Sequence, residues 1–125
     1  MTLQELYGSI GEDYEQAIRV MRMDKLVDKH IRKLPGSGLM ERLAAAGETM
    51  DPTAMFEAAH AMKGVCGNLG LANLASAVSE ITEEFRPGKD RKMTDAEVAG
   101  KLQAISARYA AAADAISRYA EEHLL

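Results

Sequence analysis

The sequence has few of the residues that build disulfides, β-sheets or nucleic-acid-binding surfaces. Cys66 is the only cysteine among 125 residues, which excludes an intramolecular disulfide and a cysteine-rich zinc site. Tryptophan is absent, aromatic residues make up 5% of the chain, and the β-branched clusters typical of strands are missing. The net charge is −4, and we see no basic block that would neutralise nucleic-acid phosphates. We therefore expect neither a β-rich fold nor nucleic-acid binding.

The chain also lacks the features of a membrane or secreted protein. No apolar run is long enough to cross a bilayer. The start, from Met1 to Glu5, has neither the basic flank nor the apolar stretch of a secretion signal. We therefore expect a cytoplasmic protein with no membrane contact.

The residues that are plentiful favour helices. Hydrophobic residues make up 47% of the chain, and Ala, Leu, Met, Glu and Lys, which all favour helix, are common. The apolar spacing predicts an all-α fold, with four longer helices over about 38–46, 52–69, 71–85 and 95–122. We expect these to form an antiparallel four-helix bundle within residues 37–123 of a single 1–125 domain. Residues 1–35 are expected to add short helices over one end or side.

Several helix ends can be predicted from their residue types. Gly47 is expected to end the first long helix. Asp51, followed by Pro52, is a helix start, and Thr94 with Glu97 forms a capping box. The last helix carries an apolar seam in steps of three and four, made by Val98, Leu102, Ile105, Tyr109, Ala112, Ile116 and Tyr119.

The predicted helix over 52–69 has an unusual outer face. Helical spacing places a core stripe on one side: Met55, Ala58, Met62, Val65 and Leu69. His60 falls on the opposite side, and the residues around it are Phe56, Glu57, Lys63, Gly64, Gly67 and Asn68.

The two glycines on this face indicate a function. Each costs roughly 1 kcal/mol relative to alanine inside a helix, and both Gly64 and Gly67 are predicted to point away from the core. Their evident use is to let another molecule approach the imidazole of His60. Lys63, one turn along, places a positive charge where a phosphoryl group on His60 would lie. A neutral imidazole is a competent nucleophile near neutral pH.

The stretch from His60 to Gly70 resembles the motif of histidine-containing phosphotransfer (HPt) domains. The matching residues are His60, Met62, Lys63, Gly64, Gly67, Asn68 and Gly70. The resemblance implies that His60 accepts a phosphoryl group from an aspartyl phosphate on a receiver domain and passes it to another receiver. It implies a phosphocarrier rather than an enzyme, with response-regulator receivers, and a hybrid histidine kinase, as candidate partners. The chain itself would need no cofactor or metal, because Mg²⁺ belongs to the receiver.

The resemblance also suggests roles for neighbouring residues. Gly64, Gly67 and Asn68 would form the docking face, and helix phase adds Phe56 and Leu71 as its apolar centre. Family members often hold the imidazole with a Gln from the following helix, and Thr82 stands at about that position. Threonine is shorter than glutamine, so Glu83 or a water is the alternative.

We expect ordinary roles for the remaining candidates. These are a structural His30, an inert His123, a buried Cys66 thiol, a solvated loop over Arg86 to Lys92, and a solvated face of Glu80, Glu83 and Glu84. The three histidines lack metal-ligand spacing.

Two other functions stay open beside the carrier. One is an HPt-like docking module that binds receivers without accepting phosphate, although it would have no need of the His60–Lys63 pair. The other is a segment of a larger histidine kinase. The helical first 35 residues favour a stand-alone carrier, which we expect to be monomeric rather than dimeric.

Overall fold

The computed structural model describes residues 1–123. Its helices are α1 (Leu3–Ser9), α2 (Tyr14–Met21), α3 (Asp24–Ile31), α4 (Leu39–Thr49), α5 (Pro52–Asn68), α6 (Ala72–Glu84) and α7 (Asp95–Glu122). Strands are absent from the described residues, which confirms the predicted all-α class. No described helix is long and apolar enough to span a bilayer.

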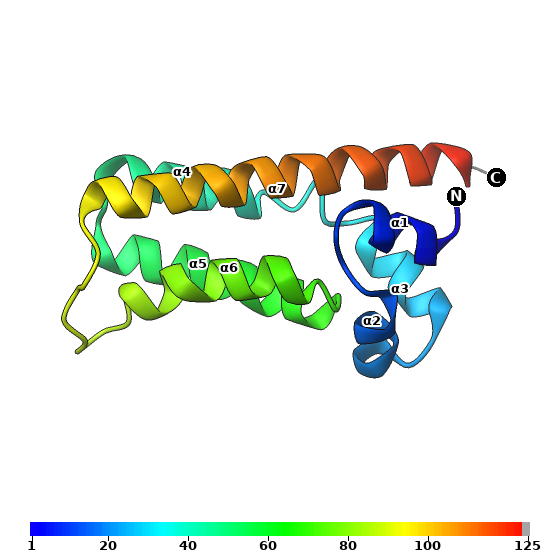
Figure 1. The fold of residues 1–125 in the computed structure, drawn as a ribbon, viewed down its shortest axis with the longest axis horizontal. Helices are drawn as coiled ribbons and strands as arrows, with labels where there is room; N and C mark the ends of the chain where they lie inside the picture. The colour runs from blue at the N-terminus through cyan, green and yellow to red at the C-terminus, as the bar shows by residue number, and fades with distance from the viewer. Residues whose placement is uncertain (124–125) are drawn as a thin grey trace.

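Helices α4 to α7 form the predicted antiparallel bundle. Helix α5 packs against α4 and α6, and α7 packs against the same two helices from the other side. Figure 1 shows that α7 runs the whole length of the molecule, whereas α5 and α6 end halfway along it. The three short helices α1 to α3 lie at that end, beneath the second half of α7, which confirms the prediction for residues 1–35. We call residues 1–35 the N-terminal unit.

The buried stripes follow helical periodicity with one exception. All seven residues of the predicted α7 seam are buried, as are Met55, Ala58, Met62 and Leu69 of α5. Val65, which we predicted in the core, is instead 37% exposed. It lies at the edge of the stripe, where a pocket rather than a packed helix faces it.

The end of α4 also differs from the prediction. The helix continues past Gly47 to Thr49, and Met50 follows it in the left-handed conformation with φ 56°. A Cβ on Gly47 would lie 2.6 Å from Cδ1 of Leu102. Gly47 is therefore a packing residue that allows α4 to approach α7 closely, and not a helix cap.

Glu84 is buried, although we predicted it on a solvated face. Its carboxylate accepts hydrogen bonds from the backbone N–H groups of Lys92 (3.0 Å) and Met93 (2.7 Å), and it pairs with Arg91. Burial alone raises the pKa of Glu84, but these hydrogen bonds and the charge of Arg91 outweigh it and lower the pKa. Glu84 therefore closes the loop between α6 and α7.

Buried polar contacts fix the N-terminal unit on the bundle. The hydroxyl of Tyr7 donates to the carbonyl oxygen of Leu69 at 2.7 Å. The carboxylate of Glu12 accepts from the first backbone N–H groups of α6, at Asn73 and Leu74, both at 2.9 Å. These N–H groups have no partner within the helix, so Glu12 caps it from a distant part of the chain.

Candidate functional site

His60 lies near the middle of α5 with its imidazole exposed. The helix begins as predicted, because Asp51 accepts a hydrogen bond from the N–H of Ala54 (3.0 Å) and Pro52 fits the first turn. The core stripe turns Met62 inward, which leaves His60 facing outward. Helix phase therefore predicted the exposure of His60 correctly.

The surface beyond His60 is open. A Cβ built on Gly64 or on Gly67 would meet no other atom within 4 Å. Asn68 is exposed and Lys63 is half-buried beside these glycines. The outward direction of the two glycines is therefore confirmed, and their missing side chains leave open space instead of allowing close packing.

The imidazole of His60 belongs to a stack of three side chains. The ring of Phe56 lies parallel to it, with centroids 5.4 Å apart and an interplanar angle of 11°. The guanidinium of Arg86 lies 5.4 Å from the centroid of the Phe56 ring. Arg86 is held in turn by Glu83 at 2.6 Å. We call Arg86, Phe56 and His60 the stack.

Arg86 is a site residue that the sequence analysis missed, since we predicted a solvated loop there. The α5–α6 hairpin turns near Gly70, so residues at equal distances before and after the turn lie opposite each other. Position 56 therefore faces the region of position 86. This register is a signal that was present in the sequence.

Charges near the stack are arranged around one carboxylate. The hydrogen bond from Arg86 lowers the pKa of Glu83, and the charges of Arg86, Lys89 and Lys63 act in the same direction. Glu83 is thus paired with Arg86 and also feels the charge of Lys63, the predicted phosphoryl-binding cation. Three cations, Arg86, Lys89 and Lys63, thus act on one carboxylate in the region of the exposed imidazole.

Two predicted site residues are not where the function would need them. Leu71 is fully buried just before α6, so it is not part of an accessible docking face. Thr82 is fully buried too, and its hydroxyl donates to the carbonyl oxygen of Val78 at 3.2 Å. No hydrogen bond joins Thr82 to His60 in the part of the chain that the structure describes. The ring of Phe56 lies against the imidazole instead.

The remaining candidates lie apart from His60. Cys66 is buried, and desolvation, with a smaller contribution from the charge of Glu12, raises its pKa to about 12, so the thiol stays protonated. His123 lies against Tyr119 with ring centroids 4.3 Å apart and makes a hydrogen bond with the carbonyl oxygen of Met1. Within residues 1–123, no group of three or more His, Cys, Asp or Glu residues is placed to hold a metal ion.

The comparisons with known proteins agree with this geometry. The family model described as "Hpt domain" matches residues 36–119, which include α4 to α6, most of α7 and the whole site. No curated protein matches the chain significantly. No solved structure does so either.

Proposed function

The chain belongs to the Hpt domain family, and we propose that His60 is the residue that carries its phosphoryl group. Membership gives the chain a histidine phosphotransfer role in a phosphorelay, as a phosphocarrier that interacts with receiver domains rather than as a catalytic enzyme. The observation that carries the proposal is the exposed imidazole beside two glycine positions with empty space above them.

The transfer proceeds as an exchange between two phosphorylated residues. A ring nitrogen of His60 attacks the phosphorus of an aspartyl phosphate on the donor receiver. The N–P bond forms as the P–O bond to the aspartate breaks, and the aspartate leaves as a carboxylate. The reverse exchange passes the group to a second receiver. This chemistry needs positioning and positive charge, and the receiver supplies Mg²⁺.

Lys63 and the stack are the contributions of this chain. Lys63 lies one turn from His60, so its ammonium offsets charge on the phosphoryl oxygens. Phe56 lies parallel to the imidazole and limits its rotation, and the guanidinium of Arg86 lies over the Phe56 ring. This arrangement takes the place of the Gln found in many relatives, and it orients the attacking nitrogen before the receiver docks.

The donors and acceptors are receiver domains of response regulators or of a hybrid histidine kinase. Gly64 and Gly67 let the loops around the receiver's aspartate approach the imidazole, because no side chain stands above them. Asn68 is exposed beside them and offers an amide to the docked surface.

The test is phosphoryl transfer from a purified, labelled receiver to the wild-type chain and to His60→Gln. We expect the wild type to gain acid-labile label and the variant to gain none above background. Circular dichroism melting should match for the two proteins, because position 60 is exposed. If receivers bind the wild type but transfer no label, the chain is a docking module and the carrier proposal is rejected.

A further inference from the structure

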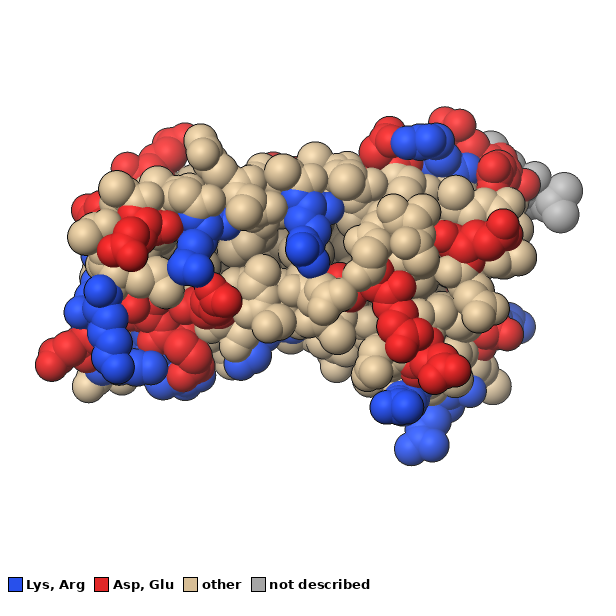
Figure 2. Space-filling model, viewed as in Figure 1, with Lys and Arg blue, Asp and Glu red and all other residues tan. Residues whose placement is uncertain are grey.

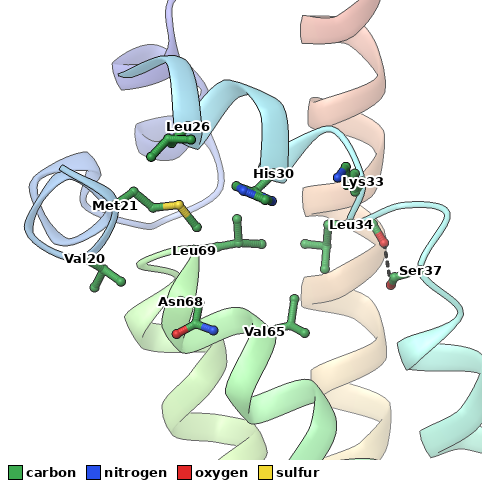
Figure 3. Close-up of a pocket in the computed structure, with 10 residues that line it drawn as sticks. All are labelled: Val20, Met21, Leu26, His30, Lys33, Leu34, Ser37, Val65, Asn68 and Leu69. Carbon is green, nitrogen blue, oxygen red and sulfur yellow. Dashed lines mark hydrogen bonds between the residues drawn. The ribbon is translucent and has the colours of Figure 1, made fainter. Parts of the chain in front are cut away.

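An apolar pocket of about 570 Å³ opens between α2, α3 and the second half of α5. Figure 3 shows that Val65 and Asn68 point into it from α5, while Met21 and Leu26 approach from the N-terminal unit. His30 and Lys33 lie at its rim. Val20, at the mouth, is 50% exposed.

Most of the pocket wall lies outside the family domain. The family match begins at residue 36, whereas Val20, Met21, Leu26, His30, Lys33 and Leu34 all precede it. Buried contacts hold this wall in place on the bundle, including the Tyr109 hydroxyl that donates to the carbonyl oxygen of Leu34 at 2.8 Å. Most of the pocket wall therefore lies before the matched family domain and is packed against it.

The pocket is close enough to His60 for one partner to cover both. Val65 and Asn68 follow His60 on the same helix, at a rise of about 7.5 Å and about 12 Å along its axis. A standard interface covers about 800 Å² of each partner, equivalent to a disc of about 16 Å radius. At 100° per residue, Asn68 lies about 80° around the helix from His60 and Val65 about 140°, so a receiver centred on His60 would reach the Asn68 side of the pocket.

The charge around the pocket restricts the partner. Residues 19–33 contain six Lys or Arg residues and two Asp residues, a net charge of +4 in a chain whose total is −4. The sequence analysis overlooked this local excess. In Figure 2, Lys and Arg side chains gather at the α2 end of the molecule, at the lower right. A second copy docked symmetrically would place two basic faces together, so the surface fits an acidic partner.

We propose that the receiver that meets His60 also inserts an apolar side chain, surrounded by acidic residues, into this pocket. The N-terminal unit thereby selects which receiver docks, because the pocket accepts only a surface of that shape and charge. This inference rests on the proposed phosphotransfer function and extends it from the reacting residue to partner choice.

The test compares two substitutions that each replace an exposed aliphatic residue by aspartate. Val20→Asp places a carboxylate at the mouth of the pocket, and Met23→Asp places one on the same unit at a residue that is 55% exposed and outside the pocket lining. We would measure the Kd of the receiver that phosphorylates the wild type fastest, and separately the phosphorylation of His60 by phosphoramidate. This small donor transfers its phosphoryl group to the imidazole with loss of ammonia and without receiver docking.

We expect Val20→Asp to raise Kd at least tenfold and Met23→Asp to change it less than twofold, with unchanged phosphoramidate rates. Equal Kd values for the two variants would overturn the pocket proposal and leave the carrier function standing. A wild type that accepts phosphate from neither receiver nor phosphoramidate would reject both.

Methyl NMR gives a second measurement. Shifts of the Val20 and Val65 methyl signals on dilution of the chain alone, and not on addition of the receiver, would assign the pocket to a second copy of the chain. That result would reject the proposal.

A second pair of substitutions tests whether acidic residues of the receiver contact the pocket. Lys33→Glu reverses a charge in the pocket lining, just after α3, and Lys25→Glu reverses a charge on α3 outside that lining. We expect Lys33→Glu to weaken receiver binding at least threefold more than Lys25→Glu does. Equal losses of receiver affinity in the two variants would show that only the overall charge attracts the receiver. The proposed contact between acidic residues and the pocket would then be rejected.

Discussion

Gly64 and Gly70 lie less than two helical turns apart, and the structure uses their missing side chains in opposite ways. Above Gly64 there is open space, with no atom within 4 Å of an added Cβ. At Gly70 the chain has φ 69°, and an added Cβ would lie 2.2 Å from the backbone nitrogen of Ala17 in α2. One glycine leaves the surface near His60 open, and the other lets the N-terminal unit pack on the bundle.

The difference separates function from stability within one motif. A glycine inside a helix costs stability, so an exposed one needs a functional reason. A glycine with a positive φ and a neighbour in contact has a structural reason already. The motif of His60 to Gly70 thus combines residues that we propose serve transfer with a residue that this chain needs for its own packing.

Of the substitutions that test this comparison, Gly70→Ala should lower the free energy of unfolding most. The new methyl group is strained at φ 69° and collides with α2, so we expect a loss of about 2–5 kcal/mol in the free energy of unfolding. Urea denaturation followed by circular dichroism measures it. Gly67→Ala is the control, because its Cβ meets open space. Equal stability of the two variants would contradict the close packing of α2 on Gly70.

Phe56→Leu tests whether the ring of Phe56 orients the imidazole of His60. Loss of the stack should slow phosphorylation by phosphoramidate about threefold to tenfold, in line with the 0.5–1.5 kcal/mol of an aromatic pair. Arg86→Gln should slow it less, because the Phe56–His60 contact remains. If only the receiver reaction slows, Phe56 serves docking and not orientation.

Gly64→Ala should move stability and transfer in opposite directions. We expect about 0.5–1 kcal/mol of added stability, because alanine favours helix and the added methyl has space. We also expect slower transfer from a receiver, with unchanged phosphorylation by phosphoramidate, since the methyl obstructs only a large partner. Stability by urea denaturation and both rates would be measured on the same preparation. An unchanged rate of transfer from the receiver would show that Gly64 does not serve access.

The smallest expected effect concerns Asp28, whose contacts help to attach the N-terminal unit to the bundle. Burial alone raises its pKa, but hydrogen bonds from Tyr119 (2.6 Å) and Arg32 (3.1 Å) outweigh this and lower the pKa below 3.8. A lowered pKa contributes stability that is present above the unfolded-state value of 3.8 and is lost as pH falls through the folded value. The contribution is at most about 1 kcal/mol because the ion pair is partly exposed.

Asp28→Asn should therefore reduce stability at pH 7 and flatten its decline below pH 4, measured by thermal unfolding at several pH values. Asp114→Asn is the matched control, because it removes an exposed carboxylate paired with Arg118 on α7. An identical pH profile for wild type and Asp28→Asn would show that the Tyr119 contact contributes nothing to attaching the unit.

Local patterns predicted much of this fold. The Thr94–Glu97 capping box and the Asp51 cap are present, and the α7 seam is buried as its spacing indicated. These features depend on residues within one or two turns of each other. The predictions that were wrong involve contacts between elements: Gly47 against Leu102, Glu84 against the α6–α7 loop, and Val65 beside the pocket.

The sequence by itself determined the helices and the outward direction of His60, because both follow from the period of one helix. Only the tertiary structure placed α2 against Gly70 and the pocket beside the second half of α5. Those contacts join segments far apart in the chain. Their geometry depends on how whole helices pack and on which loops connect them, and the helical period contains no information about either.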